Sequence, residues 1–366
     1  TEGVERSIRS AIAASRSRPD AGPVFLGGNC MGVRSRPGRY DTFFIPESKL
    51  DPRRDARPKR AALISQSGAF IITRLSNLEF LDPALAISVG NQVDLTVGDL
   101  MQAVAGRDDI DCVGVYAEGF NDLDGAKFLC AVEAAVAAGK IVVFYKAGRT
   151  SAGRSAAQGH TASVAGDYDV CDAAVARAGA VVTDTFKEFE QLIELATDLH
   201  DKRVRGNRLG VVSNAGYEAV GAADTVRGSR YRVEMPELSA ASGERLTAVL
   251  KEHRLDGLVN ARNPLDLTPM ADDAAYEECV RVLLDAEEID ALIVGCVPMT
   301  PQLLTTPAEI GREGSIAKRL ARVFHETDKP MVVVVDCSKP YNDFARAVRA
   351  EGVPVFRSAD QAVRSL

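Results

Sequence analysis

The sequence contains no tryptophan, and aromatic residues make up only 6% of its 366 positions. It has no hydrophobic run that approaches the roughly 18 residues needed to span a bilayer, and its start has no signal-peptide pattern. Its seven cysteines are scattered and form no C-x-x-C pair, so neither a disulfide framework nor a zinc site is indicated. We therefore expect no membrane partner, no bound structural metal and a location in the reducing cytoplasm.

The chain also lacks an excess of positive charge, since 44 Lys and Arg residues face 51 Asp and Glu residues. Nucleic-acid binding requires clustered basic side chains, so we expect no nucleic-acid partner. One basic run, residues 53–60, contains a proline and precedes a predicted strand, which favours a solvated linker. The chain contains no Walker A sequence and no G-x-G-x-x-G turn, so we predict no nucleotide site on it.

What the sequence does contain is a repeated alternation of short β-rich runs with alanine-rich amphipathic segments. Several of the β-rich runs are apolar on both faces, as in IVVFYKA and MVVVVD. Such runs are typical of parallel sheets that helices cover on both sides. The sequence therefore predicts an α/β fold, and its length predicts two or three domains.

The two halves of the chain resemble each other in order. The corresponding segments are residues 62–68 with 211–216, 91–96 with 263–268, 110–113 with 289–292, 140–143 with 329–332, and 178–181 with 351–354. We interpret residues 51–203 and 204–366 as two copies of one doubly wound parallel-sheet domain, preceded by residues 1–50. The alternative is that any two parallel α/β domains share such patterns.

The copies differ in one place. Lys140 to Gly179 spans 39 positions and Lys329 to Gly352 spans 23, so the first copy has 16 extra residues within 148–166. A long loop of small residues at the carboxyl end of a parallel strand is a common location for a functional site.

His160 lies in this insertion, between Gly159 and Thr161. The other three histidines, at positions 200, 253 and 325, lie in charged segments typical of solvated surface. His160 is therefore the candidate for catalysis, although an unreactive loop histidine is the simpler alternative.

Two strand–turn–helix junctions form a second candidate site. Each ends a strand with a serine and starts a helix with a glycine. The junctions are Ser65, Gln66, Ser67 and Gly68 in the first copy, and Ser213, Asn214, Ala215 and Gly216 in the second. Helix N-termini bind anions through unpaired N–H groups, so two such ends could hold one phosphate between the copies. A simple N-cap is the alternative for each junction.

Glu118 ends a predicted buried strand, in the segment V-Y-A-E-G. It is either the N-cap of the next helix or a carboxylate that orients a histidine. Cys30 has no histidine nearby in sequence, so a buried small side chain is its expected role.

These segments resemble the ADP-forming acetyl-CoA synthetases and, more distantly, the succinyl-CoA synthetase α-subunit. The similar motifs are G-G-N-C-M-G at 27–32, L-I-S-Q-S-G-A at 63–69, S-V-G-N at 88–91, K-A-G-R at 146–149 and G-H-T-A at 159–162. The resemblance implies flavodoxin-like domains, a phosphohistidine at His160, an orienting role for Glu118 and phosphate binding at both junctions. It also implies a substrate side at Asn29, Gly90 and Asn91. Gly28, Gly159, Ala162 and Tyr217 depart from the family pattern, which leaves the acid substrate open.

The implied reaction converts an acid, CoA and ATP into acyl-CoA, ADP and phosphate. Residues 1–50 then correspond to the end of a CoA-binding domain whose remainder lies upstream. ATP or ADP with Mg would bind an ATP-grasp domain or subunit, and the chain is expected to be a fragment or a split subunit in a homo- or hetero-oligomer. Two alternatives use the same scaffold: an acyl-CoA-sensing regulatory module and a citrate-lyase-like enzyme.

Overall fold

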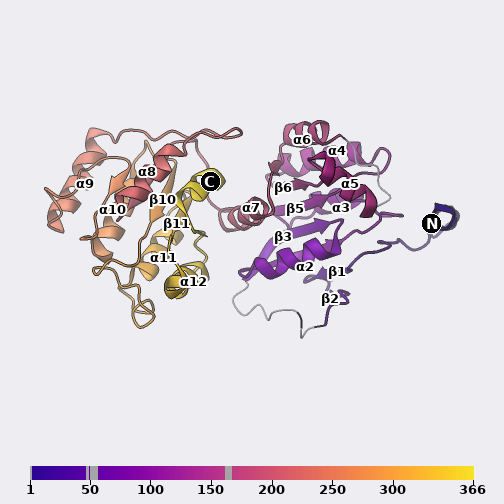
Figure 1. The fold of residues 1–366 in the computed structure, drawn as a ribbon, viewed down its shortest axis with the longest axis horizontal. Coiled ribbons are helices and arrows are strands. Elements are labelled where there is room, and N and C mark those ends of the chain that lie inside the picture. Colours follow the sequence, from indigo (N-terminus) through magenta and orange to yellow (C-terminus); the bar gives the residue numbers. More distant parts are fainter. Residues whose placement is uncertain (1, 47–48, 50–56, 161–166) are drawn as a thin grey trace. The chain divides into compact units, whose positions relative to one another are not determined.

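A computed structural model of the chain describes residues 2–46, 49, 57–160 and 167–366, without the side chains at 2, 5 and 157–160. It contains two units, Thr1–Thr197 and Asp198–Leu366, each with its own sheet (Figure 1). Both sheets are mainly parallel and flanked by helices, which confirms the predicted α/β class. Among the described residues, no helix combines the length and the apolar character needed to cross a membrane.

The sheet of the first unit has seven strands in the order β2-β1-β4-β3-β5-β6-β7. The strands are β1 (Val33–Ser35), β2 (Tyr40–Asp41), β3 (Arg57–Ser65), β4 (Leu81–Ser88), β5 (Cys112–Ala117), β6 (Ile141–Lys146) and β7 (Val181–Thr183). Strands β3 to β7 pair in parallel, whereas β1 pairs antiparallel with both neighbours. The basic run ends inside β3, so its second half is strand and not linker, and residues 53–56 lie outside the described part.

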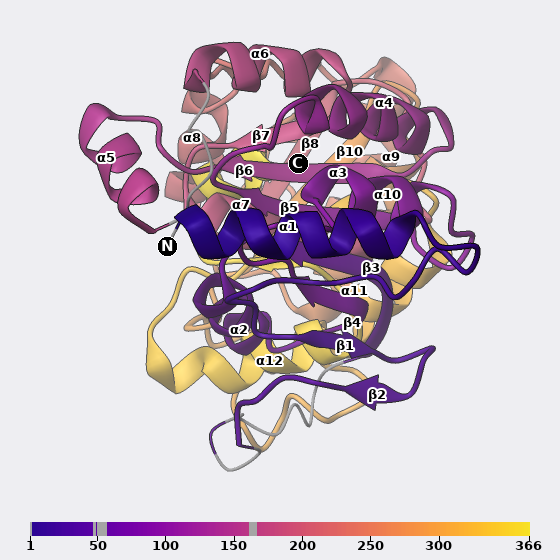
Figure 2. The same cartoon turned by 90° about the vertical axis from the view of Figure 1, so that its right-hand side faces the viewer.

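Helices cover both faces of this sheet. The helices of this unit are α1 (Glu2–Arg16), α2 (Gly68–Asn77), α3 (Val97–Ala105), α4 (Asp124–Ala137), α5 (Ser151–His160), α6 (Tyr168–Arg177) and α7 (Phe186–Asp198). The two covering layers consist of α2 and α7 on one face and of α3, α4 and α6 on the other. Along β3, Ala61 and Leu63 face α2 and α7, while Ala62 and Ile64 face α3, α4 and α6. Helix α1 faces the viewer in Figure 2, and its Arg9 donates to backbone carbonyls of the loop after β4.

The second unit has a smaller, fully parallel sheet with the order β12-β11-β10-β8-β9. Its elements are β8 (Leu209–Ser213), α8 (Gly216–Asp224), α9 (Ala240–Glu252), β9 (Leu265–Asp266), α10 (Asp273–Asp285), β10 (Ala291–Gly295), α11 (Ile316–Glu326), β11 (Met331–Val334), η2 (Lys339–Tyr341), α12 (Asn342–Ala350), β12 (Val355–Phe356) and α13 (Ala359–Ser365). Helices α9 to α12 pack on one face in a single hydrophobic core, and α8 and α13 contact each other and the strands from the other side.

The sheets repeat the same contacts at corresponding positions. Asp111 directly precedes β5, and Asp290 directly precedes β10. The Asp111 N–H donates to the Arg60 carbonyl and the Asp290 N–H to the Arg208 carbonyl, each over 2.7 Å. Arg60 pairs with Asp111, and Arg208 pairs with Asp290. Four of the five sequence correspondences therefore fall on equivalent strands or turns.

The fifth correspondence, between residues 91–96 and 263–268, is wrong as a structural equivalence. In the first unit the segment lies in the loop after β4, whereas in the second it contains β9 itself. Val89 and Leu267 are the true counterparts, because each donates its N–H to the serine that ends the neighbouring strand, over 2.7 and 2.8 Å. The two N-x-x-D-L-T segments therefore occupy positions that differ by several residues in the structural alignment of the units.

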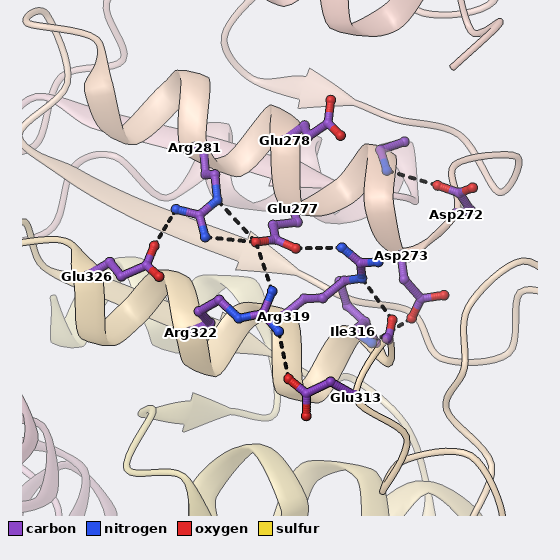
Figure 3. Close-up of polar contacts among 12 residues, drawn as sticks. Asp272, Asp273, Glu277, Glu278, Arg281, Glu313, Ile316, Arg319, Arg322 and Glu326 are labelled. Atoms are coloured by element: carbon purple, nitrogen blue, oxygen red, sulfur yellow. Dashed lines mark hydrogen bonds and ion pairs between the residues drawn. The ribbon is translucent and has the colours of Figure 1, made fainter. Parts of the chain in front are cut away.

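The largest charge cluster of the second unit joins α10 to α11 (Figure 3). The buried carboxylate of Glu277 accepts from Arg281 at 2.8 Å and Arg319 at 2.6 Å, and Arg322 lies 3.8 Å away. Burial raises the pKa of Glu277, but these hydrogen bonds outweigh it and hold the pKa below its usual value. All three guanidinium groups are paired, so this cluster is a bridge between helices and not a free anion site.

Candidate functional site

The start of α2 keeps N–H groups available at the carboxyl end of β3. Ser65 Oγ accepts from the Ser67 N–H at 3.1 Å, and Ser67 Oγ caps the helix by accepting from the Phe70 N–H at 3.2 Å. Helix geometry leaves the N–H groups of Gly68 and Ala69 without intrahelical acceptors. Together with the helix dipole, they favour an anion at this position.

Gln66 connects this turn to the end of β5. Its side chain is 3% exposed, and Oε1 accepts from the backbone N–H groups of Glu118 and Gly119, the latter at 3.1 Å. Because both partners are donors, the oxygen must face them and the amide nitrogen must point elsewhere. In the described part of the structure, Nε2 is buried and has no hydrogen-bond partner. Such an orphaned donor is costly unless a ligand accepts from it.

Glu118 directly follows β5 and is half-buried. Tyr116, two residues earlier on the same strand, donates its hydroxyl to Glu118 Oε1 at 3.2 Å. The backbone carbonyl of Glu118 accepts from Lys146 Nζ at 2.7 Å, and the same ammonium donates to the Ala147 carbonyl at 2.8 Å. Burial lowers the pKa of Lys146 and raises that of Tyr116. Helix α4 begins with Leu123 as its N-cap, so the N-cap interpretation of Glu118 is wrong.

The predicted substrate-side residues lie beside this turn. The Asn91 N–H donates to the Gly28 carbonyl at 2.8 Å, which brings Asn29 next to Gly90. Gly90 has a φ of +65°, and a Cβ there would lie 2.2 Å from the Gly28 oxygen, so only glycine fits. Cys30 is half-buried, with its sulfur 3.6 Å from a backbone carbonyl, rather than fully buried as expected.

His160 is the last residue of α5, the helix that follows β6. Its side chain and residues 161–166 lie outside the described part, so its distance from Glu118 stays a prediction. The insertion was expected to be a loop, but residues 151–160 of it form a helix. His325 is exposed as predicted, whereas His253 is half-buried, with Nε2 3.2 Å from Glu278.

The start of α8 in the second unit reproduces the frame of the α2 start. Ser213 Oγ accepts from the Ala215 N–H at 3.1 Å, as Ser65 does for Ser67. Asn214 Oδ1 accepts from the Val297 N–H at 2.8 Å, and its Nδ2 donates to the Val297 carbonyl at 2.9 Å. The amide of Asn214 is therefore satisfied at both ends.

Acidic groups surround the start of α8. Glu218, at the third helical position, is 2% exposed, and its Oε2 accepts from Ser213 Oγ at 2.6 Å. Burial raises the pKa of Glu218 to about 7, and the nearby charge of Asp336 adds to this shift. A Cβ at Gly216 would lie 2.8 Å from the Asp266 carboxylate. Whether Asn214, Ala215 and Gly216 bind phosphate stays a prediction, as does the anion site shared by the copies.

Sequence reasoning missed the contacts that hold Glu118. The alternation of Tyr116 and Glu118 on one strand face was visible as an i, i+2 pair. The long-range contacts from Gln66 and Lys146 gave no local signal, because they span 52 and 28 positions. Among the described residues, no three His, Cys, Asp or Glu side chains gather in a way that could hold a metal.

Comparison with known proteins identifies relatives of both units. Residues 58–196 match the succinyl-CoA ligase like flavodoxin domain. The chain is 29% identical, over 281 residues, to the α-subunit of ADP-forming acetate–CoA ligase II of Pyrococcus furiosus, covering 76% of this chain and 57% of that protein. It is 28% identical over 347 residues to ADP-forming acetate–CoA ligase I of Archaeoglobus fulgidus, covering 94% and 45% of the two chains.

The fold agrees with a solved structure. An acetyl-coenzyme A synthetase of Candidatus Korarchaeum cryptofilum, determined with phosphate and ADP, superposes with a TM-score of 0.81 at 23% identity, covering 100% of this chain and 72% of that one. The chain spans about half the length of the two curated relatives described above. These comparisons confirm the resemblance drawn from the motifs. The chain is therefore similar over most of its length to ADP-forming acetate–CoA ligases, and its residues 58–196 match the succinyl-CoA ligase like flavodoxin domain.

Proposed function

We propose that this chain is the α-type portion of an ADP-forming acyl-CoA ligase. The complete enzyme converts an acid, CoA and ATP into acyl-CoA, ADP and phosphate. The nucleotide and its Mg bind an ATP-grasp domain or subunit that partners this chain. The relatives support this assignment, since the chain is similar to the α-subunits of both acetate–CoA ligase II and acetate–CoA ligase I of Pyrococcus furiosus.

We propose residue roles in the direction that consumes acyl-CoA. Phosphate attacks the acyl carbon and displaces the CoA thiol, which leaves an acyl phosphate. A ring nitrogen of His160 then attacks phosphorus, so that an N–P bond forms while the P–O bond to the departing carboxylate breaks. The phosphoryl group finally moves from His160 to an oxygen of ADP on the partner, which regenerates the free histidine and yields ATP.

The observation that supports this proposal best is the set of contacts around the start of α2. Ser65, Ser67 and Gly68 form a helix start with free N–H groups, and Gln66 ties it to Glu118. A carboxylate next to an anion site is unfavourable unless a positive or proton-donating group separates them. A histidine whose other ring nitrogen donates to Glu118 meets this need, and its free nitrogen is then the nucleophile.

The remaining positions complete the proposal. Asn29, Gly90 and Asn91 would bind the acid or the acyl–CoA junction, since they adjoin the start of α2. Asn214, Ala215 and Gly216 would approach the phosphoryl group from the second copy. We also propose that residues 1–50 end a CoA-binding domain and that 51–203 and 204–366 are the two copies, a division supported by the matching Arg60–Asp111 and Arg208–Asp290 contacts.

The test is labelling with acetyl phosphate that carries a radioactive phosphorus. The full chain is expected to gain acid-labile, base-stable label, and His160→Ala is expected to abolish it. His200→Ala and His325→Ala serve as controls and are expected to label like the unchanged chain. Undiminished acid-labile label on the His160→Ala protein would refute the assignment.

A further inference from the structure

We infer that Lys146 is a positioning residue that frees the amide N–H groups of Gln66 to bind the transferred phosphoryl group. This inference rests on the proposed function and extends it, because it explains how the α2 site gains a side-chain donor. Lys146 itself is the last residue of β6 and is 3% exposed. None of the sequence motifs pointed to this role.

In the first unit, two different side chains bind the backbone N–H and the backbone carbonyl of Glu118. Gln66 Oε1 holds the N–H of Glu118, and Lys146 Nζ holds its carbonyl oxygen at 2.7 Å. The second proton of the ammonium goes to the Ala147 carbonyl at 2.8 Å. Because Lys146 has already taken the nearest carbonyl, Gln66 Nε2 remains buried and without a partner among the described residues.

The second unit shows the same turn without a lysine. Lys146 lies opposite Ala117 in the β5–β6 pair. The counterpart of Ala117 is Cys296, since Val297 is the counterpart of Glu118. Gly295 lies opposite Val334, so the next residue, Val335, occupies the position of Lys146. There Asn214 holds both the N–H and the carbonyl of Val297, at 2.8 and 2.9 Å. The second N–H of the Asn214 amide donates to the Thr300 hydroxyl at 3.2 Å. Where the lysine is absent, the amide therefore has no donor left for a ligand.

The comparison indicates what Lys146 adds to the first unit. A primary amide has one acceptor oxygen and one nitrogen with two donors. The oxygen is engaged in both units, so the state of the nitrogen is the difference between them. In the first unit the nitrogen is available at the helix start that the proposed function assigns to phosphate, and a charge-assisted hydrogen bond to a phosphoryl oxygen is among the stronger kinds.

A purely structural tie is the alternative, and the chain offers a matched control for it. Lys140, just before the other end of β6, also donates to two backbone carbonyls, those of Arg107 and Ile110, each at 2.5 Å. Lys140→Met removes such a tie at the edge of the sheet opposite the site. If Lys146 only fastens strands, both substitutions should lower stability and labelling alike.

The experiment measures the rate of labelling by radioactive acetyl phosphate at saturating concentration, on full-length variants whose folding is checked by urea unfolding. Lys146→Val installs the residue of the second unit and is expected to lower the maximal rate by about tenfold to a hundredfold, because Gln66 can then bond the Glu118 carbonyl. Lys146→Gln, which retains an N–H donor for that carbonyl, is expected to keep a larger part of the rate. Lys140→Met is expected to label within about twofold of the unchanged chain. Equal losses for Lys140→Met and Lys146→Val, or an unchanged rate for Lys146→Val, would overturn the inference.

A second measurement separates this inference from the proposed function. The side-chain amide signals of Gln66, observed by ¹⁵N NMR, are expected to shift when inorganic phosphate is added to the unchanged chain and to stay fixed in Lys146→Val. If the unchanged chain takes no label, the proposed function fails, and the NMR result alone decides the role of Lys146. Amide signals that ignore phosphate in both proteins, or that shift equally in both, would refute it.

Discussion

The helix starts of α2 and α8 share a backbone frame and differ in their electrostatics. In each, a serine ends the strand, its oxygen accepts from the N–H two residues on, and an amide side chain grips the end of the neighbouring strand. The first start has a free amide donor and no acidic residue in its opening turn. The second has the buried Glu218 at its third position. If the start of α2 binds phosphate as proposed, the shared backbone frame alone does not account for it, because the side chains around the start of α8 are acidic.

The residues to which we assign the proposed chemistry differ between the two units. Position 118 is a glutamate in the first unit, and its counterpart in the second is Val297. The aromatic ring of Tyr116 is replaced by Gly295, and Lys146 by Val335. Glu118, Tyr116 and Lys146 thus occur only in the unit that also has the extra helix ending at His160, whereas both units share the backbone contacts of the turn.

The largest expected effect is that of a substitution at Glu118, compared with one at its counterpart Val297. Glu118→Gln removes the carboxylate that orients His160 in the proposed mechanism, so the labelling rate is expected to fall by about a thousandfold. Val297→Ala, at the counterpart position, is expected to change the rate by less than about threefold. Equal rates in the Glu118→Gln and unchanged proteins would exclude an orienting role for this carboxylate.

The next effect concerns the Arg60–Asp111 and Arg208–Asp290 pairs, which lie at the amino ends of β5 and β10 in their own sheets. Asp290 is 3% exposed and accepts three hydrogen bonds from Arg208, whose contact holds the pKa of Asp290 below its usual value. Asp290→Ala is expected to lower the free energy of unfolding by about 3 kcal/mol, since donors lose a buried carboxylate. Asp111→Ala, at a site that is 18% exposed, is expected to cost about 1 kcal/mol. Hydrogen exchange in β10 and β5 measures the two losses separately, and an equal cost would contradict the burial argument.

A pH series sharpens the contrast at α8. The pKa of Glu218 is about 7 in the folded protein and near the usual 4.5 when unfolded, so between these pH values Glu218 is protonated in the folded state and ionised in the unfolded state. Its contribution to stability is complete at low pH and is lost as the pH rises toward about 7. Relative to the unchanged chain, Glu218→Gln is expected to gain about 2 kcal/mol between about pH 5.5 and pH 8.

Hydrogen exchange at the β8 amides follows this gain, with each variant compared to the unchanged chain at the same pH. Glu252→Gln, at an exposed position in the last turn of α9, is the control and is expected to show no such trend. A constant difference between Glu218→Gln and the unchanged chain across the series would mean that Glu218 stays ionised when folded.

The smallest effect tests two glycines at equivalent turns. Gly179 and Gly352 have φ values of +97° and +88° after α6 and α12. Gly352→Ala is expected to cost about 1 kcal/mol from backbone strain. Gly179→Ala is expected to cost more than this strain alone, because its Cβ would lie 2.9 Å from a methyl group of Val136. Urea unfolding of the full chain compares them, and a reversed order would contradict the close packing at Gly179.

The sequence predicted the fold class because strand periodicity and apolar runs report burial locally. The same local signals allowed an N-cap at the first junction, which Ser67 provides, and placed Glu118 at the carboxyl end of a strand, where it directly follows β5. The predicted pairing of residues 91–96 with 263–268 failed because identical letters can serve different turns. Only the ladder contacts of Val89 and Leu267 reveal the correct alignment.

The missing parts of the site were beyond sequence reasoning for a physical reason. A hydrogen bond between a side chain and a distant backbone group leaves no preference for the residue type at the far end. Gln66 contacts the N–H groups of residues 118 and 119, and nothing in those residues announces it. Likewise, the acidic surroundings of α8 arise from Glu218, Asp266 and Asp336, which lie on three separate segments.

The grip of Gln66 and Asn214 on main-chain atoms has an evolutionary consequence. An amide that binds the main-chain groups at the next strand end does not sense which side chain that position carries. Mutation there can proceed from valine to glutamate, or back, while the turn keeps its geometry and the fold its stability. The backbone of the turn thus tolerates exchange of the side chain at this position, so a carboxylate could be acquired or lost there in one step while the contacts of the turn persist.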